Sequence, residues 1–237
     1  MFRKKNPVEL LFPRRCPVCD EPVPLKEGLC CKACRGKLQK IRDPYCLRCG
    51  KPLSDATREY CADCGKTKHL YVRGRSLYEY ESAAPAIYRF KYGGRQEYAT
   101  FFGQELAEEL GRFITDFSPQ ALVPVPLSRK RLHTRGYNQA ALLAKELGKC
   151  LDIPVWEHAV SRVRNTVPQK ELNAAERQNN LKKAFNIGRN DVKLYDRVIL
   201  VDDIYTTGTT LDEIAALLKA GGVSEVYCVT LACGAGL

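Results

Sequence analysis

The sequence has no apolar run that approaches the ~18 residues of a membrane-spanning helix. Its first residues, "MFRKKNPVELLFPRRC", are basic, but they hold only a five-residue stretch of mixed apolar character around Glu9. That is far short of the apolar region of a secretory signal. We therefore expect a soluble, cytoplasmic chain with neither a signal peptide nor a membrane span.

Histidine is also scarce, and His69, His133 and His158 show no spacing that would let them bind one metal ion. Cysteine, by contrast, is abundant, and nine of the 12 cysteines precede residue 65. In a chain without a secretory signal, so many thiols indicate a reducing compartment and metal binding rather than disulfides.

Eight of these cysteines form the pattern C-x2-C-x11-C-x2-C twice, 30 positions apart. The two sets are Cys16, Cys19, Cys31 and Cys34, and then Cys46, Cys49, Cys61 and Cys64. Each pair of thiolates can reach one ion from a tight turn, and two pairs complete the tetrahedral sulfur site that zinc favours. We predict two structural zinc ions. Consecutive and interleaved pairing use the same ligands, and the identical spacing favours consecutive pairing.

The positive charge is concentrated in the same region. The net charge is +11, and residues 1–75 hold 18 Lys and Arg against 8 Asp and Glu. If each zinc site contributes −2, the excess of this segment falls from +10 to +6. The remaining excess favours a polyanionic partner.

The chain divides into two predicted units, a zinc-binding module over residues 1–72 and an α/β domain over 73–237. In the second unit we expect extended structure at 75–80, then two helices divided by Gly93 and Gly94. The second helix would turn one face toward a sheet, through Phe101, Leu106, Leu110 and Phe113.

Further along, residues 121–126 predict a buried strand and residues 138–149 a helix that closes near Gly148. Residues 198–201 predict a central strand, followed by a helix and a last strand, which together make a βαβ unit. Cys150, Cys228 and Cys233 fall in these elements, and we expect them to be buried apolar residues.

Two basic segments are candidates for nucleic-acid or phosphate binding. "YRFKYGGR" interleaves Tyr88, Phe90 and Tyr92 with cations, which suits stacking on bases or, equally, packing of an aromatic helix edge on the core. The loop after the 121–126 strand would hold a pyrophosphate or a nucleic-acid backbone, if it is more than a solvated charge run. Its cations are Arg129, Lys130, Arg131 and Arg135. We expect a ligand to order the polar stretch 161–183.

The stretch "VILVDDIYTTGTT" places an acid pair, Asp202 and Asp203, at the carboxyl end of a strand, where open α/β sheets bind ligands. The next turn gathers free amides and hydroxyls at a helix N-terminus, which forms a phosphate pocket. Its residues are Thr206, Thr207, Gly208, Thr209 and Thr210. Two carboxylates beside a phosphate suit the vicinal hydroxyls of a ribose 5-phosphate group. Thr210 and Glu213 also fit a capping box.

The same stretch resembles the phosphoribosyl pyrophosphate (PRPP) loop of type I phosphoribosyltransferases. With the cysteine repeat, "FKYGGR", "VPVPLSRKRLHTRGYNQAALLA" and "RNTVPQKELNAAERQNNLKKAF", nearly the whole chain resembles the ComF family. The resemblance implies a type I phosphoribosyltransferase-like parallel sheet with helices on both faces, preceded by a double zinc ribbon. It also implies that Asp202 and Asp203 bind the ribose hydroxyls, that residues 206–210 bind the 5-phosphate, and that the basic loop meets the pyrophosphate with Mg²⁺.

For function, the resemblance implies handling of imported single-stranded DNA in natural transformation. Purine-salvage members of the wider fold carry an aspartate where this chain has Thr206, so a carboxylate base is missing there. An N-terminal cysteine of the amidotransferase type is missing as well. We therefore favour ligand binding over catalysis. The alternatives are an active phosphoribosyltransferase with an unidentified acceptor, and a zinc module that serves as an adaptor for a helicase-type competence partner.

Overall fold

The computed structural model describes residues 13–162, 185–187 and 195–234. Its main sheet has four parallel strands in the order β1-β6-β5-β2. They are β1 (Gly74–Glu79), β2 (Ala121–Pro124), β5 (Arg197–Tyr205) and β6 (Glu225–Cys233). A small antiparallel sheet pairs β3 (Val160–Arg162) with β4 (Phe185–Ile187). All four main strands therefore end at one edge, the carboxyl edge of the sheet.

Strand β5 lies inside the sheet and is buried on both faces, as its continuous apolar run predicts. Ile199 and Val201 pack into one core, while Val198 and Leu200 point the other way into a second core. The alternation follows from the two-residue period of a strand.

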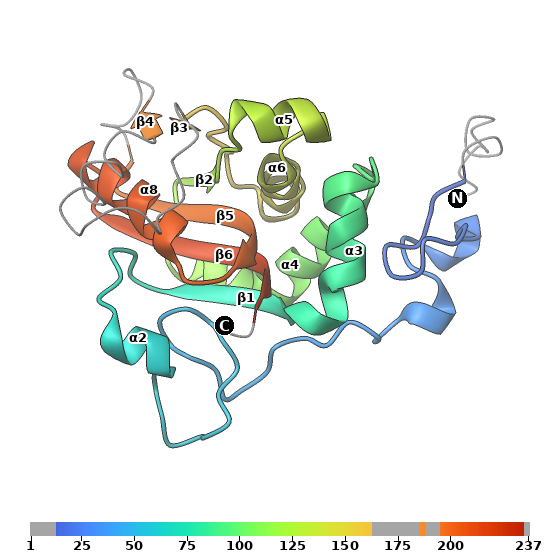
Figure 1. Cartoon of the computed structure of the whole chain (residues 1–237), viewed down its shortest axis with the longest axis horizontal. Coiled ribbons are helices and arrows are strands. Elements are labelled where there is room, and N and C mark those ends of the chain that lie inside the picture. The colour runs from blue at the N-terminus through green and yellow to red at the C-terminus, as the bar shows by residue number, and fades with distance from the viewer. Residues whose placement is uncertain (1–12, 163–184, 188–194, 235–237) are drawn as a thin grey trace.

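The first core lies under three helices, α3 (Tyr80–Tyr92), α4 (Tyr98–Thr115) and α6 (Gln139–Leu151). Helix α8 (Thr209–Ala220) covers the opposite face (Figure 1). The short helix α5 (Arg129–Arg135) follows β2 and precedes α6 in the chain, and Figure 1 shows it above α6. Helices on both faces of a parallel sheet are what β-α-β connections produce.

Between residues 13 and 72, regular structure is limited to the turns η1 (Leu25–Glu27) and η2 (Lys32–Cys34), helix α2 (Ala62–Lys66) and isolated bridges. Its middle pairs with the free edge of β1, since Ile41 N donates to Leu77 O (2.8 Å) and Glu79 N donates to Gln39 O (2.9 Å). This pairing covers a sheet edge that would otherwise be exposed. The boundary between residues 72 and 73 stays a prediction.

Several local predictions were wrong in detail. The buried face of α4 runs through Phe102, Leu106, Leu110 and Ile114, so Phe101 and Phe113 lie at its edge. Helix α6 passes through Gly148 and ends at Leu151. Glycine is required there because a Cβ would lie 2.6 Å from Ile153 O, where the chain turns back. Cys228 and Cys233 are buried as predicted, whereas Cys150 is exposed.

The basic segment 129–135 is a helix rather than the predicted loop. Ser128 caps it by accepting a hydrogen bond from Arg131 N (3.3 Å), and Gly136 ends it in the left-handed region at φ 78°. Across residues 13–162, 185–187 and 195–234, no helix is both long enough and apolar enough to cross a membrane.

Candidate functional site

The eight predicted zinc ligands come together as two groups of four, each group holding one half of the repeat. Within each group the candidate ligand atoms all lie within 4.8 Å of one another. Cys19 and Cys31 have sulfurs 3.8 Å apart, as do Cys49 and Cys61. Tetrahedral zinc with sulfur at about 2.3 Å requires sulfur separations of about 3.8 Å. The donor set fits zinc, and the ligands are grouped consecutively, as the spacing favoured.

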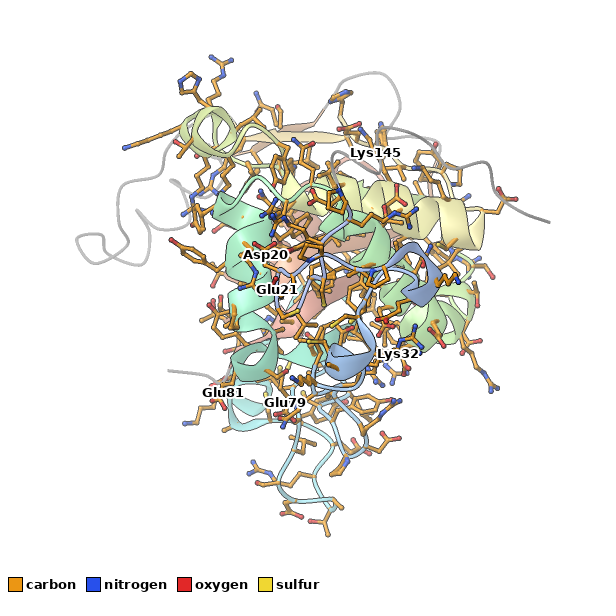
Figure 2. The ribbon with its side chains drawn as sticks, turned by 90° about the vertical axis from the view of Figure 1, so that its right-hand side faces the viewer. Asp20, Glu21, Lys32, Glu79, Glu81 and Lys145 are labelled. Atoms are coloured by element: carbon orange, nitrogen blue, oxygen red, sulfur yellow. The ribbon has the colours of Figure 1, made fainter. Side chains whose placement is uncertain are left out.

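The first zinc turn docks through Asp20, labelled in Figure 2, on the start of α4 and the loop before it, and through Val18 on α3. Arg95 Nε lies 2.9 Å from Asp20 Oδ1, and the Tyr98 hydroxyl donates to the same carboxylate. Arg89 also donates to Val18 O (2.6 Å). Burial opposes ionisation of Asp20, but the bonds from Arg95 and Tyr98 hold its pKa below the ordinary value. This ribbon therefore rests on the elements that follow β1.

The acid pair lies at the carboxyl edge of the sheet, but it is still part of β5. The prediction ended the strand at Val201, opposite the last residue of β2. The strand runs on to Tyr205 because β6 continues beside it, pairing Thr230 with Asp202. Asp203 N donates to Asp202 Oδ1 (2.8 Å), so the two carboxylates are held on the same short segment.

Each acid is kept from repelling the other in a different way. Lys91 Nζ, from the last turn of α3, lies 2.8 Å from Asp203 Oδ1, and both side chains are mostly buried. Burial, and then the charge of Asp203, raise the pKa of Asp202 to about 8. The positive charges of Lys91 and Arg131 act in the opposite direction. The site therefore holds one ion-paired carboxylate beside a carboxyl group whose ionisation is disfavoured.

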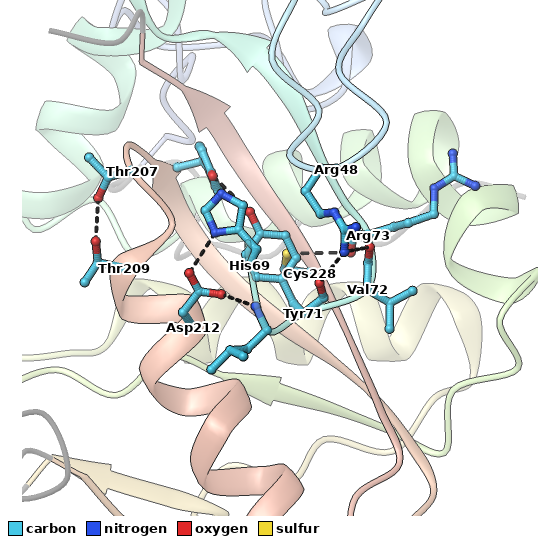
Figure 3. Close-up of polar contacts among 11 residues, drawn as sticks. Arg48, His69, Tyr71, Val72, Arg73, Thr207, Thr209, Asp212 and Cys228 are labelled. Carbon is cyan, nitrogen blue, oxygen red and sulfur yellow. Dashed lines mark hydrogen bonds and ion pairs between the residues drawn. The ribbon is translucent and has the colours of Figure 1, made fainter. Parts of the chain in front are cut away.

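The predicted phosphate loop connects β5 to α8. Gly208 is the N-cap of α8 in the left-handed region at φ 79°, which glycine adopts most readily. Thr207 Oγ1 and Thr209 Oγ1 lie 2.9 Å apart (Figure 3). Thr206 and Thr207 are exposed. The first amides of a helix have no intrahelical acceptor, so this end of α8 can bind an anion.

The predicted capping box does not form. Helix α8 begins one residue before Thr210, and no side chain caps it. Glu213 is half-buried, and burial raises its pKa although Arg162 lies near enough to lower it. The threonine hydroxyls are therefore not used to start the helix, which leaves Gly208 and the backbone to set the turn.

The four predicted cations of the basic segment have different surroundings. Arg129, Lys130 and Arg131 are exposed on α5, and the charge of Arg131 acts on both Asp202 and Arg162. Arg135 turns toward α3, where its guanidinium lies 4.7 Å from the centre of the Tyr92 ring and donates to the Tyr92 hydroxyl (2.9 Å).

The aromatic residues of "YRFKYGGR" divide between core and surface. Phe90 is fully buried against Phe102 and Tyr137. Tyr88 is 65% exposed and Tyr92 is 55% exposed, with ring centres 5.1 Å apart. Packing on the core is therefore confirmed for Phe90, while stacking on bases stays a prediction for the two exposed tyrosines.

Two contacts near the site could not be predicted from the sequence. No local pattern around Lys91 indicates that it pairs with Asp203. The buried His69 contacts Asp212 on α8, and no motif predicts this contact. Of the polar stretch 161–183, residues 163–183 lie outside the described residues, so the prediction about them is not addressed.

Comparison with known families finds two domains to which parts of the chain are similar. Residues 8–65 match the double zinc ribbon domain, and residues 132–235 match the phosphoribosyl transferase domain. With the parallel sheet and its helices on both faces, the second match confirms the predicted type I phosphoribosyltransferase-like fold. One solved structure, the allosteric regulatory enzyme of purine biosynthesis, has a TM-score of 0.41 at 22% identity over 57% of this chain and 25% of its own. That likeness is too distant to add to the assignment.

Relatives of higher identity cover almost the full length. Competence protein F of Haemophilus influenzae is 35% identical over 93% of this chain and 97% of its own. Competence protein ComFC of Bacillus subtilis is 33% identical over 85% of this chain and 82% of its own. The DNA utilization protein YhgH of Escherichia coli is 31% identical over 93% of this chain and 98% of its own.

Proposed function

This chain belongs to the ComF family of competence proteins, and on that premise we propose that it handles single-stranded DNA in the cytoplasm during natural transformation. We propose further that a pocket at the carboxyl edge of its sheet binds PRPP or a related phosphoribosyl ligand. The zinc ribbon over residues 1–72 and the domain over 73–237 are the two units that would share this work.

One observation carries the proposal: helix α3 contributes to both candidate surfaces. Its Lys91 is ion-paired with Asp203 of the acid pair, and its Tyr88 and Tyr92 face outward beside Arg135. Exposed aromatic rings beside cations are the features on which single strands stack and are neutralised. A ligand at the acid pair and a strand on the tyrosines would therefore contact the same helix.

In the pocket, we assign binding roles to the residues at the end of β5 and the start of α8. Asp202 and Asp203 would accept hydrogen bonds from the ribose hydroxyls. The 5-phosphate would lie on the amides and hydroxyls of residues 206–210, where the positive end of the helix dipole favours an anion. Arg131, with the exposed Arg129 and Lys130, would meet the pyrophosphate, and Mg²⁺ would supply the charge that bridges pyrophosphate to the protein.

The proposal is tested by two titrations on the full-length protein. Fluorescence anisotropy with a labelled single strand should give an affinity that falls steeply with salt and that weakens in Arg131→Gln/Arg135→Gln. Calorimetry should detect Mg²⁺-dependent binding of PRPP that Asp202→Ala/Asp203→Ala abolishes. Binding of DNA that neither salt nor the arginine substitutions change would contradict the DNA role, and absence of PRPP binding would contradict the pocket.

A second candidate, an active phosphoribosyltransferase, is favoured by one observation. Asp202 is a carboxyl group whose pKa of about 8 places its titration near working pH, and such groups cluster at functional sites. Release of pyrophosphate from PRPP that depends on an added amine or base would support this activity. A broad panel of acceptors that gives no release would leave binding as the role.

A helicase-type competence partner is the third part of the proposal, assigned to the zinc ribbons. Lys37 and Arg58 are exposed cations of the first and second ribbon. Capture of a helicase by the full-length chain that is lost in Lys37→Glu/Arg58→Glu and retained in Arg131→Gln would separate this contact from DNA binding. Capture that requires DNA would count against a direct protein contact.

A further inference from the structure

A short connecting segment, residues 69–72, lies between the second zinc ribbon and the phosphate loop. On the zinc side, Arg48 stands between the ligands Cys46 and Cys49 and donates from Nη1 to Tyr71 O (3.0 Å) and Val72 O (2.9 Å). On the sheet side, Val72 N donates to Val226 O (2.8 Å). The segment is thus fixed between the zinc turn and β6 (Figure 3).

Two rings of this segment face the end of β5 and the start of α8. Tyr71 is fully buried, and its hydroxyl lies 2.9 Å from that of Tyr205, the last residue of β5. The His69 ring stacks on Tyr71 with centres 4.8 Å apart and an interplanar angle of 24°. Because the zinc ribbon holds Tyr71 by its carbonyl, it also fixes the ring on which His69 rests.

His69 and Leu70 form hydrogen bonds with the two carboxylate oxygens of Asp212, in the first turn of α8. His69 Nδ1 lies 2.7 Å from Asp212 Oδ2, and Leu70 N donates to Asp212 Oδ1 (2.7 Å). A carboxylate only accepts hydrogen bonds, so Nδ1 carries the hydrogen. Figure 3 shows Asp212 pointing toward His69. A free carboxylate at this helix end would repel a bound phosphate. The donors His69 Nδ1 and Leu70 N hold the Asp212 carboxylate toward residues 69 and 70.

The same ring supports the glycine of the loop. A Cβ at Gly208 would lie 2.7 Å from Tyr205 Oη and 3.0 Å from His69 Cε1, so both side chains lie directly against the loop backbone. The His69 side chain is 1% exposed, and among the described residues its Nε2 has no hydrogen-bond partner. Burial of a polar nitrogen without a partner is unfavourable, which indicates that packing and Asp212 hold the ring in place.

We propose that His69 is a positioning residue of the phosphate loop, and that the second zinc ribbon contributes to ligand affinity through it. The ring braces Gly208 from the side of the ribbon and orients Asp212 away from the anion. The inference rests on the proposed function, since the anion is the 5-phosphate of the phosphoribosyl ligand.

The test compares His69→Phe, His69→Asn and Arg48→Met in the full chain. Phenylalanine keeps the stacking but loses the Nδ1–H donor, whereas the asparagine amide reproduces that donor. In calorimetry with ribose 5-phosphate, we expect His69→Phe to bind about ten-fold more weakly, as for loss of one hydrogen bond to a charged group. His69→Asn should recover part of the affinity, because it restores the donor to Asp212 but not the ring against Gly208. Arg48→Met should weaken binding while zinc analysis still gives two equivalents.

Hydrogen exchange of residues 206–212 without ligand gives a second, independent measurement. It should be faster in His69→Asn, which lacks the ring that packs against Gly208, and in Arg48→Met than in wild type. It should stay close to wild type in His158→Phe, which alters an exposed histidine. Wild-type affinity in His69→Phe together with wild-type exchange in His69→Asn would overturn the inference. If the wild-type chain does not bind ribose 5-phosphate, the proposed pocket fails, and unchanged exchange in His69→Asn would separately reject the brace.

Discussion

Lys91 Nζ lies 2.8 Å from Asp203 Oδ1, joining the last turn of α3 to the end of the central strand β5. Lys91 is 14% exposed and Asp203 is 11% exposed in their side chains, so water screens the pair weakly. The neighbouring Asp202 has its pKa raised to about 8, first by burial and then by the charge of Asp203. Two adjacent acids are therefore tolerated because one is paired with a cation and ionisation of the other is disfavoured.

Replacing Lys91 by methionine should destabilise the protein by about 3 kcal/mol, because it leaves a buried carboxylate without its partner. The control is Lys145→Met, which breaks a half-exposed pair with Glu157 and should cost less than about 1 kcal/mol. Urea unfolding monitored by circular dichroism measures both. Equal losses in the two variants would show that the Lys91 pair has no special role. Added Mg²⁺ should restore part of the stability of Lys91→Met by supplying the missing charge.

The raised pKa of Asp202 predicts a pH dependence of stability. The ordinary value is 3.8 and the folded value is about 8, so the folded state holds a proton that the unfolded state releases. The stability contributed by this proton is complete below about pH 4 and is lost as pH rises to about 8. Asp202→Asn removes this titration. The melting temperature of the variant relative to wild type should therefore rise between pH 5 and 8, and the difference should stay constant at higher pH.

The check is a series of thermal melts at constant ionic strength from pH 5 to 9. Asp116→Asn, at the exposed C-terminal end of α4, serves as the control. A constant difference between Asp202→Asn and wild type over that range would disprove the shifted titration. Ligand-free protein is used, since a phosphoribosyl ligand would bring ionisations of its own.

The features that could be predicted from sequence are those encoded within a few residues. The zinc ligands follow from the spacing of Cys16 and Cys19 and its repetition, since each pair needs only one turn to reach an ion. The strand, acid pair and loop from Val198 to Thr210 are likewise continuous in the chain, so their order along it fixes their order in space. Both patterns also carry the resemblance to the ComF family.

The contacts that could not be predicted join segments far apart in the sequence. His69 and Asp212 are separated by 143 residues, and a lone histidine gives no periodic signal. Lys91 was visible only as one cation among several, because nothing local indicates that its side chain turns toward β5 rather than outward. The predicted capping box was also wrong. Gly208 begins α8 through its backbone conformation, and no threonine side chain caps the helix.

Loss of a ligand from the second zinc site should harm the whole fold more than loss from the first. Cys49 is 1% exposed and packs in the core with Tyr71 and Cys228, whereas Cys19 is exposed. We expect Cys49→Ser to lower the melting temperature by roughly 5 °C more than Cys19→Ser, which corresponds to one or two kcal/mol for a domain of this size. Zinc analysis should show about one equivalent lost in each. A larger effect from Cys19→Ser would contradict the integration of the second ribbon into the core.

The exposed tyrosines of α3 should contribute to binding of single-stranded DNA by stacking. Tyr88→Ala and Tyr92→Ala should each weaken binding by about ten-fold, since stacking of a base on an aromatic ring is worth about 1–3 kcal/mol. Tyr80→Ala alters an exposed tyrosine at the start of the same helix and should have little effect. The salt dependence should stay unchanged in all three, because no phosphate contact is lost. Fluorescence anisotropy at two salt concentrations measures both quantities, and a loss confined to Tyr80→Ala would place the strand elsewhere on the molecule.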